Sequence, residues 1–480
     1  DRRAYAVFTI HLTAVLAGLF VASLYNPLLG SLLFTLYLTW SPWHYSGQNY
    51  GLAVMFLRRR GVEVTPVAKR LLYASFLLSY AIVFVAFHLA GTGGAVGYGP
   101  TLPQADSYAF LPLGIPGSWA TPLYVGLGSL YAAAVIAALA LLARGAALRD
   151  LGPALVLVAS QAIWFAAPGL ARASGTFQEI APLSIQAAPY VGMWIAIAHA
   201  VQYLWVTTYY AARDESHGGR ARYLAKALLA GSAIWGVPAL LFSPDLLGNV
   251  PYNMGLFMMV AATVNLHHFI LDGAIWKLRN PRIANVLLRS GDDATRDSAI
   301  GKRSFAGPIG WAAGFACLII FVLGDLESQA VPRAAARGDV SRVEQATRRL
   351  AAIGRDSPKL HHQIALLAQR EGDAERAERE FKKALEVYET KNVWHNLGAF
   401  YLSQGRSDEA LDAFDHALAI DPSLLPTLVQ ASTAALSVGE PDRALTYLQD
   451  AARLAPNDPS LRRRIARVYD LQTTPDEPLP

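Results

Sequence analysis

Three polar residues inside an apolar stretch are the clearest candidates for chemistry in this sequence. Asn265, His268 and Asp272 follow one another at spacings of three and four residues, so on a helix they share one face. The residues around them are apolar enough to lie in a membrane, where ionisable side chains are costly and usually point into a helix bundle. This segment is therefore predicted to contribute to a functional site.

Histidines on two other apolar segments are predicted to lie at a similar depth. His44 has Gln48 one turn further on, and His199 has Gln202 beside it. Neutral imidazole is a common ligand of iron, copper and zinc, and bound histidines usually donate their second N–H to a carboxylate or an amide. Three or four histidines, including His267 and His268, would fill a mononuclear or dinuclear metal site. Its surrounding polar groups are predicted to be Gln48, Gln202, Asn265 and Asp272.

Other interpretations of these residues are open. His199 and His268 could instead be the axial ligands of a haem. The polar groups could also simply bond one another and hold helices together, and Asp272 could form a salt bridge with Lys277. His11, at mid-depth on the first apolar segment, could join the site, whereas His88 is expected to lie outside it.

The N-terminal two thirds of the chain is predicted to be a polytopic transmembrane helix bundle, in an all-α fold. The chain is 53% hydrophobic and 16% charged, and most charges before about residue 325 lie between long apolar runs. Nine segments approach the ~20 residues that a spanning helix needs, and the first is expected to be a retained span rather than a signal peptide. Residues 44–60 are expected to continue as a helix along the cytoplasmic interface. The nine segments lie near residues 4–22, 28–45, 69–91, 120–143, 151–171, 186–211, 223–242, 253–276 and 307–325.

The loops between these segments predict the orientation. Lys and Arg gather in alternate loops, around residues 58–70, 144–149, 213–222 and 277–289. Because cytoplasmic loops carry such an excess, the N-terminus is predicted to be cytoplasmic and the residues after the ninth span extracytoplasmic, in a bacterial inner membrane. The basic residues thus indicate a lipid bilayer as partner, and no nucleic acid is expected. The loop 92–119 is expected to fold over the bundle, and an interfacial aromatic belt is expected from Trp43, Tyr45, Tyr50 and Trp276.

The C-terminal third carries a repeat of large and small residues. One copy begins with Trp394, Leu397, Gly398 and Tyr401. The residue types at its later positions recur one repeat earlier as Gly372, Ala377, Phe381 and Ala384, and one repeat later as Gly439, Ala444, Leu448 and Ala451. This pattern resembles the tetratricopeptide repeat (TPR), whose helix pairs stack into a curved α-solenoid that binds peptides or proteins. Its histidines, His361, His362, His395 and His416, are predicted to lie at the surface or in the groove. The predicted domains are a bundle over 1–326 and an extracytoplasmic TPR domain over 327–480, with repeats near 357–390, 391–424 and 425–457 and a capping helix over 458–470.

Two short motifs of the bundle resemble motifs in uncharacterised bacterial multi-pass proteins that are likened to the Brp/Blh carotene dioxygenases. The motifs are HYSGQ, from His44 to Gln48, and HxxxDGxxWK, from His268 to Lys277. Those enzymes use histidine-bound iron to cleave a polyene. The resemblance implies iron bound by His44, His199, His267 and His268, with Asp272 next to the ligands.

The predicted function is a metal-dependent oxidoreductase of the oxygenase type that acts on a lipid-soluble substrate and binds a protein through its TPR domain. The alternative is a non-enzymatic scaffold or an assembly subunit of a membrane complex. A third class, lipid-linked glycan transferases, would need acidic residues on outer loops, where Asp106, Glu179 and Asp245 are available. The sequence has no nucleotide-binding loop, no serine nucleophile elbow and no HExxH motif. Its one cysteine, Cys317, excludes an intrachain disulfide and a cysteine-based metal site.

Overall fold

The computed structural model describes residues 2–89, 108–174, 188–213, 220–244, 246–275 and 306–473. These residues are almost entirely helical, which confirms the all-α fold. The chain divides into two compact units. Unit 1 comprises Asp1–Pro238 and Asn253–Ile319, and unit 2 comprises Ala239–Tyr252 and Ile320–Pro480.

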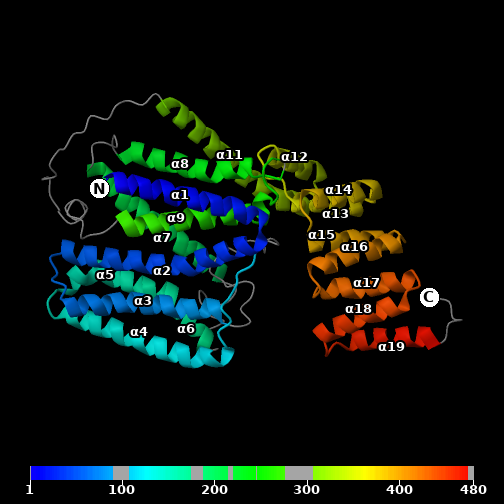
Figure 1. Ribbon diagram of the computed structural model, residues 1–480, viewed down its shortest axis with the longest axis horizontal. Helices are drawn as coiled ribbons and strands as arrows, with labels where there is room; N and C mark the ends of the chain where they lie inside the picture. The colour runs from blue at the N-terminus through cyan, green and yellow to red at the C-terminus, as the bar shows by residue number, and fades with distance from the viewer. Residues whose placement is uncertain are drawn as a thin grey trace. The chain divides into compact units, whose positions relative to one another are not determined.

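Helices occur at all nine positions where spans were predicted, and most of them run side by side in unit 1 (Figure 1). Within the described residues, seven helical segments are long and apolar enough to cross a membrane by length and composition. α2 and α7 are not among the seven, and these are two of the helices that carry the histidines. The helices are α1 (Arg2–Tyr25), α2 (Pro27–Arg59), α3 (Pro66–His88), α4 (Ala120–Ala143), α5 (Leu148–Gln161), a π-helical turn (Ala162–Ala166), α6 (Ala167–Ser174), α7 (Ala188–Arg213), α8 (Arg220–Leu241), α9 (Leu256–Ile275) and α11 (Ala306–Ala336).

Helix α2 is longer than a single span and is buried over much of its length. It begins where the Asn26 side chain accepts a hydrogen bond from the Leu29 N–H, and it continues past His44 to Arg59. Residues 44–60 were expected to continue as a helix along the cytoplasmic interface, and the helix does continue to Arg59. Leu52, Met55 and Leu57 of this stretch are buried in a core shared with α3 and α5, because this half of α2 is apolar on the face toward those helices. The long helix places His44 deep in the bundle rather than at its edge.

The described end of loop 92–119 lies along the first half of α2, and its residues 108–113 are called the strap below. The Tyr108 hydroxyl donates a hydrogen bond to the Ser23 carbonyl at 3.0 Å, and its ring fills the space where a side chain at Gly30 would stand. Further along this strap, the backbone N–H groups of Ala109, Leu111 and Leu113 donate to Ser31 Oγ, Thr35 Oγ1 and His88 Nδ1. The strap therefore satisfies its backbone donors on side chains of α2 and α3.

Unit 2 contains successive helix pairs, coloured from olive and yellow through orange to red in Figure 1. Each pair packs through small residues: a side chain at Gly398 would come within 2.6 Å of the Phe414 ring, so only glycine lets α15 and α16 approach this closely. Phe381, Phe414 and Ala417 are fully buried in or beside the shared core. The helices are α12 (Val340–Ala351), α13 (Pro358–Glu371), α14 (Ala374–Val387), α15 (Lys391–Ser403), α16 (Ser407–Ile420), α17 (Leu425–Ser437), α18 (Pro441–Leu454) and α19 (Pro459–Thr473).

His361, expected at the surface or in the groove, is buried between two carboxylates. Its Nδ1 lies 2.8 Å from Glu380 Oε2, and its Nε2 lies 3.3 Å from Asp356 Oδ2. Burial lowers the pKa of His361, but the hydrogen bonds to Asp356 and Glu380 outweigh it and raise the pKa to about 9. The histidine is therefore a protonated link between α13 and α14 at neutral pH.

This link predicts a pH-dependent stability of unit 2. The folded-state pKa of His361 lies above its unfolded value of ~6.5, so the contribution is complete below pH ~6.5 and is lost as the pH rises toward about 9. Over that interval, the free energy of unfolding of unit 2 is expected to fall by on the order of 1–2 kcal/mol. Calorimetry of the detergent-solubilised chain between pH 6 and 9.5 measures this change, and a His361→Gln variant should show a flat profile. An equal slope in the variant would contradict the assignment.

Candidate metal centre

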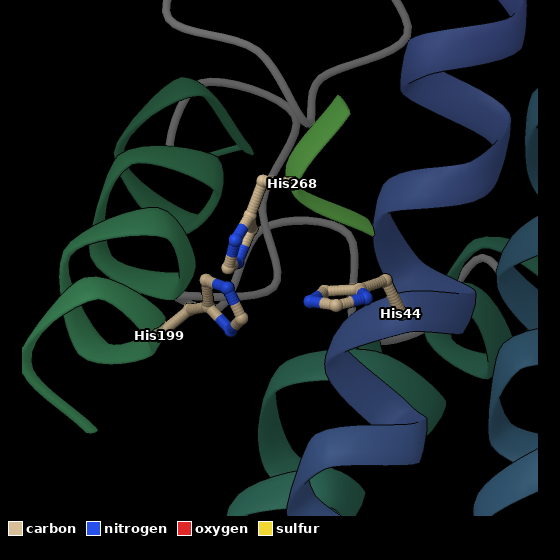
Figure 2. A group of neighbouring side chains, drawn as sticks. All are labelled: His44, His199 and His268. Atoms are coloured by element: carbon tan, nitrogen blue, oxygen red, sulfur yellow. The ribbon is translucent and has the colours of Figure 1, made fainter. Parts of the chain in front are cut away.

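Three histidines from three helices of unit 1 meet in the interior of the bundle. His44 comes from α2, His199 from α7 and His268 from α9, and Figure 2 shows their rings pointing toward one another. One ring nitrogen of each lies within 4.8 Å of the other two. The ring centroids are 5.1 Å apart for His44 and His199, 5.2 Å for His44 and His268, and 5.8 Å for His199 and His268. Residues up to 224 positions apart (268 − 44) thus form one cluster.

The Asp272 carboxylate lies against two of these histidines. Its Oδ2 is 3.6 Å from His44 Nε2 and 3.5 Å from His268 Nε2, and its side chain is 13% exposed. The contact with His268 follows from the helical spacing, because residues four apart lie on the same face of α9. A carboxylate at this position can orient both imidazoles or serve as a further oxygen ligand.

Three aromatic rings contact the histidines of the cluster. Phe269 stacks on His44 with centroids 4.2 Å apart, Tyr45 lies 4.4 Å from His199, and Tyr203 meets His268 at 4.6 Å with perpendicular rings. Tyr45 was expected in the interfacial belt, yet it contacts the site because α2 buries the face that carries it. For Tyr203, the spacing of four residues from His199 on one helix was the available signal.

The donor set fits a metal ion. His44 Nε2, His199 Nε2 and Gln48 Oε1 are buried without a hydrogen-bond partner among the described residues, and such atoms are costly unless something binds them. Ligand nitrogens ~2.1 Å from a tetrahedral ion lie ~3.4 Å apart, closer than the 4.8 Å limit of this cluster. Side-chain rotations that move the nitrogens by ~1 Å would therefore complete the site.

The remaining predicted site residues lie at different distances from the cluster. The amides of Gln48 and Gln202 pair directly, with Gln48 Nε2 donating to Gln202 Oε1 at 3.2 Å. His267 does not join its neighbour His268, because its Nε2 faces α1 and lies 3.0 Å from Thr13 Oγ1. Asn265 donates to the Ala261 carbonyl of its own helix at 2.8 Å rather than to a histidine.

Two other histidines of the bundle are also engaged elsewhere. His11 Nδ1 lies 2.7 Å from the Val7 carbonyl in the same helix, and His88 contacts Thr39 and the strap. Lys277 and Trp276, together with Asp106, Glu179 and Asp245, lie outside the described residues.

Two cavities border the cluster on different sides. A cavity of about 520 Å³ reaches His44, Tyr203 and Asp272, and is otherwise lined mostly by apolar and aromatic side chains of α2, α3 and α9. A smaller one of about 130 Å³ reaches His199 and Gln202 and extends toward the π-helical turn. His44 and His199 therefore border space that a substrate could occupy.

A buried amide next to the site holds α2, α3 and α5 together. Gln161, 1% exposed, accepts a hydrogen bond from Asn49 Nδ2 at 2.9 Å and donates to Ser46 Oγ at 2.6 Å and to Ser79 Oγ at 2.8 Å. The π-helical turn begins at the next residue, and such turns are frequent at functional sites. Gln161 thus fixes the part of α2 that carries His44.

Replacing Gln161 with leucine is expected to destabilise unit 1. The change removes three hydrogen bonds and leaves the buried Asn49 amide without its acceptor, at a cost of about 1–3 kcal/mol. Thermal unfolding in detergent measures the loss as a lower melting temperature. Ser232→Ala is the control, because Ser232 is buried but bonds only the Leu228 carbonyl of its own helix. Equal melting temperatures for Gln161→Leu and the unaltered protein would contradict the proposed role of the amide.

Comparison with known proteins identifies the helix pairs of unit 2. The family model described as "Tetratricopeptide repeat" matches residues 356–423 and 389–457. The C-terminal helix pairs are tetratricopeptide repeats. The matched residues lie outside the bundle, so the resemblance of the bundle to proteins likened to the Brp/Blh carotene dioxygenases stays a prediction. No curated protein is similar enough to the chain to be matched.

Solved structures that resemble the chain match about a third of its length. A structure of PilF from Pseudomonas aeruginosa is 23% identical, and the match spans 32% of this chain and 71% of that chain with a TM-score of 0.28. A crystal structure of MamA is 15% identical over 29% and 83% of the two chains, with a TM-score of 0.27. YrrB, described as a TPR protein with an unusual peptide-binding site, is 14% identical over 32% and 76%, also with a TM-score of 0.27.

Proposed function

We propose that this protein is a membrane-embedded, metal-dependent oxidoreductase that acts on a lipid-soluble substrate. The observation that carries the proposal is the convergence of His44, His199 and His268 from three helices around one point, with the Asp272 carboxylate beside two of them. Iron is the expected metal, because imidazole and carboxylate donors that leave open coordination positions are typical of non-haem iron oxygenases.

The metal would supply a centre that activates dioxygen or polarises the substrate. The three imidazoles would hold the metal, and Asp272 would orient those of His44 and His268. Phe269, Tyr45 and Tyr203 would limit the access of water. A haem is less compatible with this arrangement, because its flat ring would have to enter between His199 and His268, whose rings already stand edge to face.

The TPR domain is proposed to bring a protein or peptide partner to the enzyme. TPR arrays present a curved surface that binds such partners. The alternation of loops rich in Lys and Arg with loops that carry almost none supports a cytoplasmic N-terminus and an extracytoplasmic TPR domain in a bacterial inner membrane. The partner would then be met on the outer side of that membrane.

A scaffold or assembly subunit is the second candidate, favoured by the TPR repeats themselves. In that case, the buried histidines would only link helices. The two functions differ in a measurable way, because a scaffold needs neither a metal nor dioxygen.

Dioxygen uptake tests the proposed reaction. The protein would be loaded with Fe²⁺ under anaerobic conditions, reconstituted with a bacterial lipid extract, and then exposed to oxygen in an electrode chamber. The proposal predicts protein-dependent uptake together with an oxidised lipid detectable by mass spectrometry. A His199→Ala variant should show only the uptake of protein-free liposomes. No difference between the two proteins would favour the scaffold.

A further inference from the structure

The larger cavity is elongated along α2. Its lining residues on this helix run from Trp40 to Met55, which corresponds to ~22 Å at 1.5 Å per residue. Gly47 and Gly51 lie one turn apart on this wall, and no atom lies within 4 Å of a Cβ built at either position. The absence of side chains at these two positions leaves a channel along the helix surface.

The imidazole, amide and carboxylate side chains of this cavity lie at one level. His44, Gln48 and Asp272 line it beside the metal centre, whereas Leu52 and Phe76 line it further along. A buried polar group needs a partner, and an apolar wall favours an apolar ligand. The lining therefore suits a long apolar molecule with one polar or reactive position near His44.

The lining of the cavity includes large side chains that are nearly half exposed. Trp43 is 42% exposed, Tyr73 46% and Leu77 41%, and all three also line the cavity. They belong to α2 and α3, and α3 is apolar enough to span a membrane. An apolar opening on such a surface faces lipid rather than water.

We propose that the cavity along Gly47 and Gly51 binds a single-chain lipid that enters sideways from the bilayer between α2 and α3. The chain lies in the channel past Leu52 and Met55, and the polar or reactive position of the lipid lies at His44. The oxidation of this lipid rests on the proposed function, but its binding depends only on the cavity.

A photoreactive lipid tests the binding site. Stearyl alcohol with a diazirine in mid-chain would be added to phosphatidylcholine proteoliposomes and activated by light, and its adducts would be mapped by mass spectrometry. The proposal predicts adducts on Leu52, Met55 or Phe76, which are buried and which bulk lipid cannot reach. Excess stearyl alcohol without the diazirine should remove these adducts.

Two leucine substitutions at helical glycines separate the cavity from the general lipid surface. Gly47→Leu fills the channel, and adducts at the buried positions are expected to fall at least about fivefold. Gly126→Leu adds the same side chain on α4, where space is equally open and neither of the two cavities described above is lined, and should change nothing. Adducts confined to exposed residues such as Leu130, or unaffected by Gly47→Leu, would overturn the proposal.

The outcome is independent of the metal. A His199→Ala variant is expected to keep the buried adducts even where it loses metal, because His199 does not line this cavity. Intact metal binding in a protein without buried adducts would leave the proposed function standing and remove only the lipid site.

Discussion

A variant in which His199 and His268 are both replaced by alanine is expected to lose at least about nine tenths of the bound metal. Removing an outer partner of a metal ligand already lowers affinity ~10–100-fold, and here two of three candidate ligands disappear. His44 alone, with Asp272, cannot retain an ion against a chelating buffer. Elemental analysis of the protein, purified in detergent after identical metal loading, measures the effect.

The matched control replaces two histidines of the same bundle that lie outside the cluster. His267 contacts Thr13, and His88 contacts Thr39 and the strap. A His88→Ala/His267→Ala variant is therefore expected to keep its metal, even where it is somewhat less stable. If both double variants lost metal equally, the loss would reflect damage to the bundle and not removal of ligands.

Truncation of Phe414 to alanine is expected to destabilise the TPR domain by about 3–5 kcal/mol. The ring is fully buried and packs onto Gly398, where no larger residue fits, so the cavity left by alanine has no side chain to fill it. Hydrogen exchange of the amides in α15 and α16 measures the change in the full-length chain. Amide hydrogens that exchange only when the domain unfolds should exchange more than a hundredfold faster in the Phe414→Ala variant than in the unaltered protein.

The control for this change is on the same helix. Ile420 is 43% exposed, so Ile420→Ala should alter exchange only slightly. The metal content of the Phe414→Ala variant should equal that of the unaltered protein, because the cluster lies in unit 1. Slow exchange in α15 and α16 of the Phe414→Ala variant would contradict the packing described for this pair.

The helices and the meeting of three histidines could be predicted from sequence for simple physical reasons. Long apolar runs must become helices in a membrane because every backbone group needs an internal partner. Helices that are predicted to cross in the same direction place residues of equal sequence depth at equal predicted membrane depth, and this predicted His199 and His268 at one level. The contact between His268 and Asp272 follows from their spacing on one helix.

Other features depend on packing that spacing does not determine. His267 and His268 are adjacent in sequence, and only the position of α1 decides that His267 contacts Thr13 instead of the cluster. The Gln161 network joins three helices through residues far apart in the chain. In the TPR domain, the period predicts the helix pairs, but burial of His361 depends on the particular pair Asp356 and Glu380.

X-ray absorption spectroscopy of the purified, metal-loaded protein tests the central claim most directly. The account predicts about one metal ion per chain, with nitrogen and oxygen ligands at ~2.0–2.2 Å and the outer-shell scattering of about three imidazole rings. A protein that binds no metal, or a metal whose surroundings show no imidazole, would contradict the account. The three histidines would then be links between helices, and the function would have to be sought at the TPR domain.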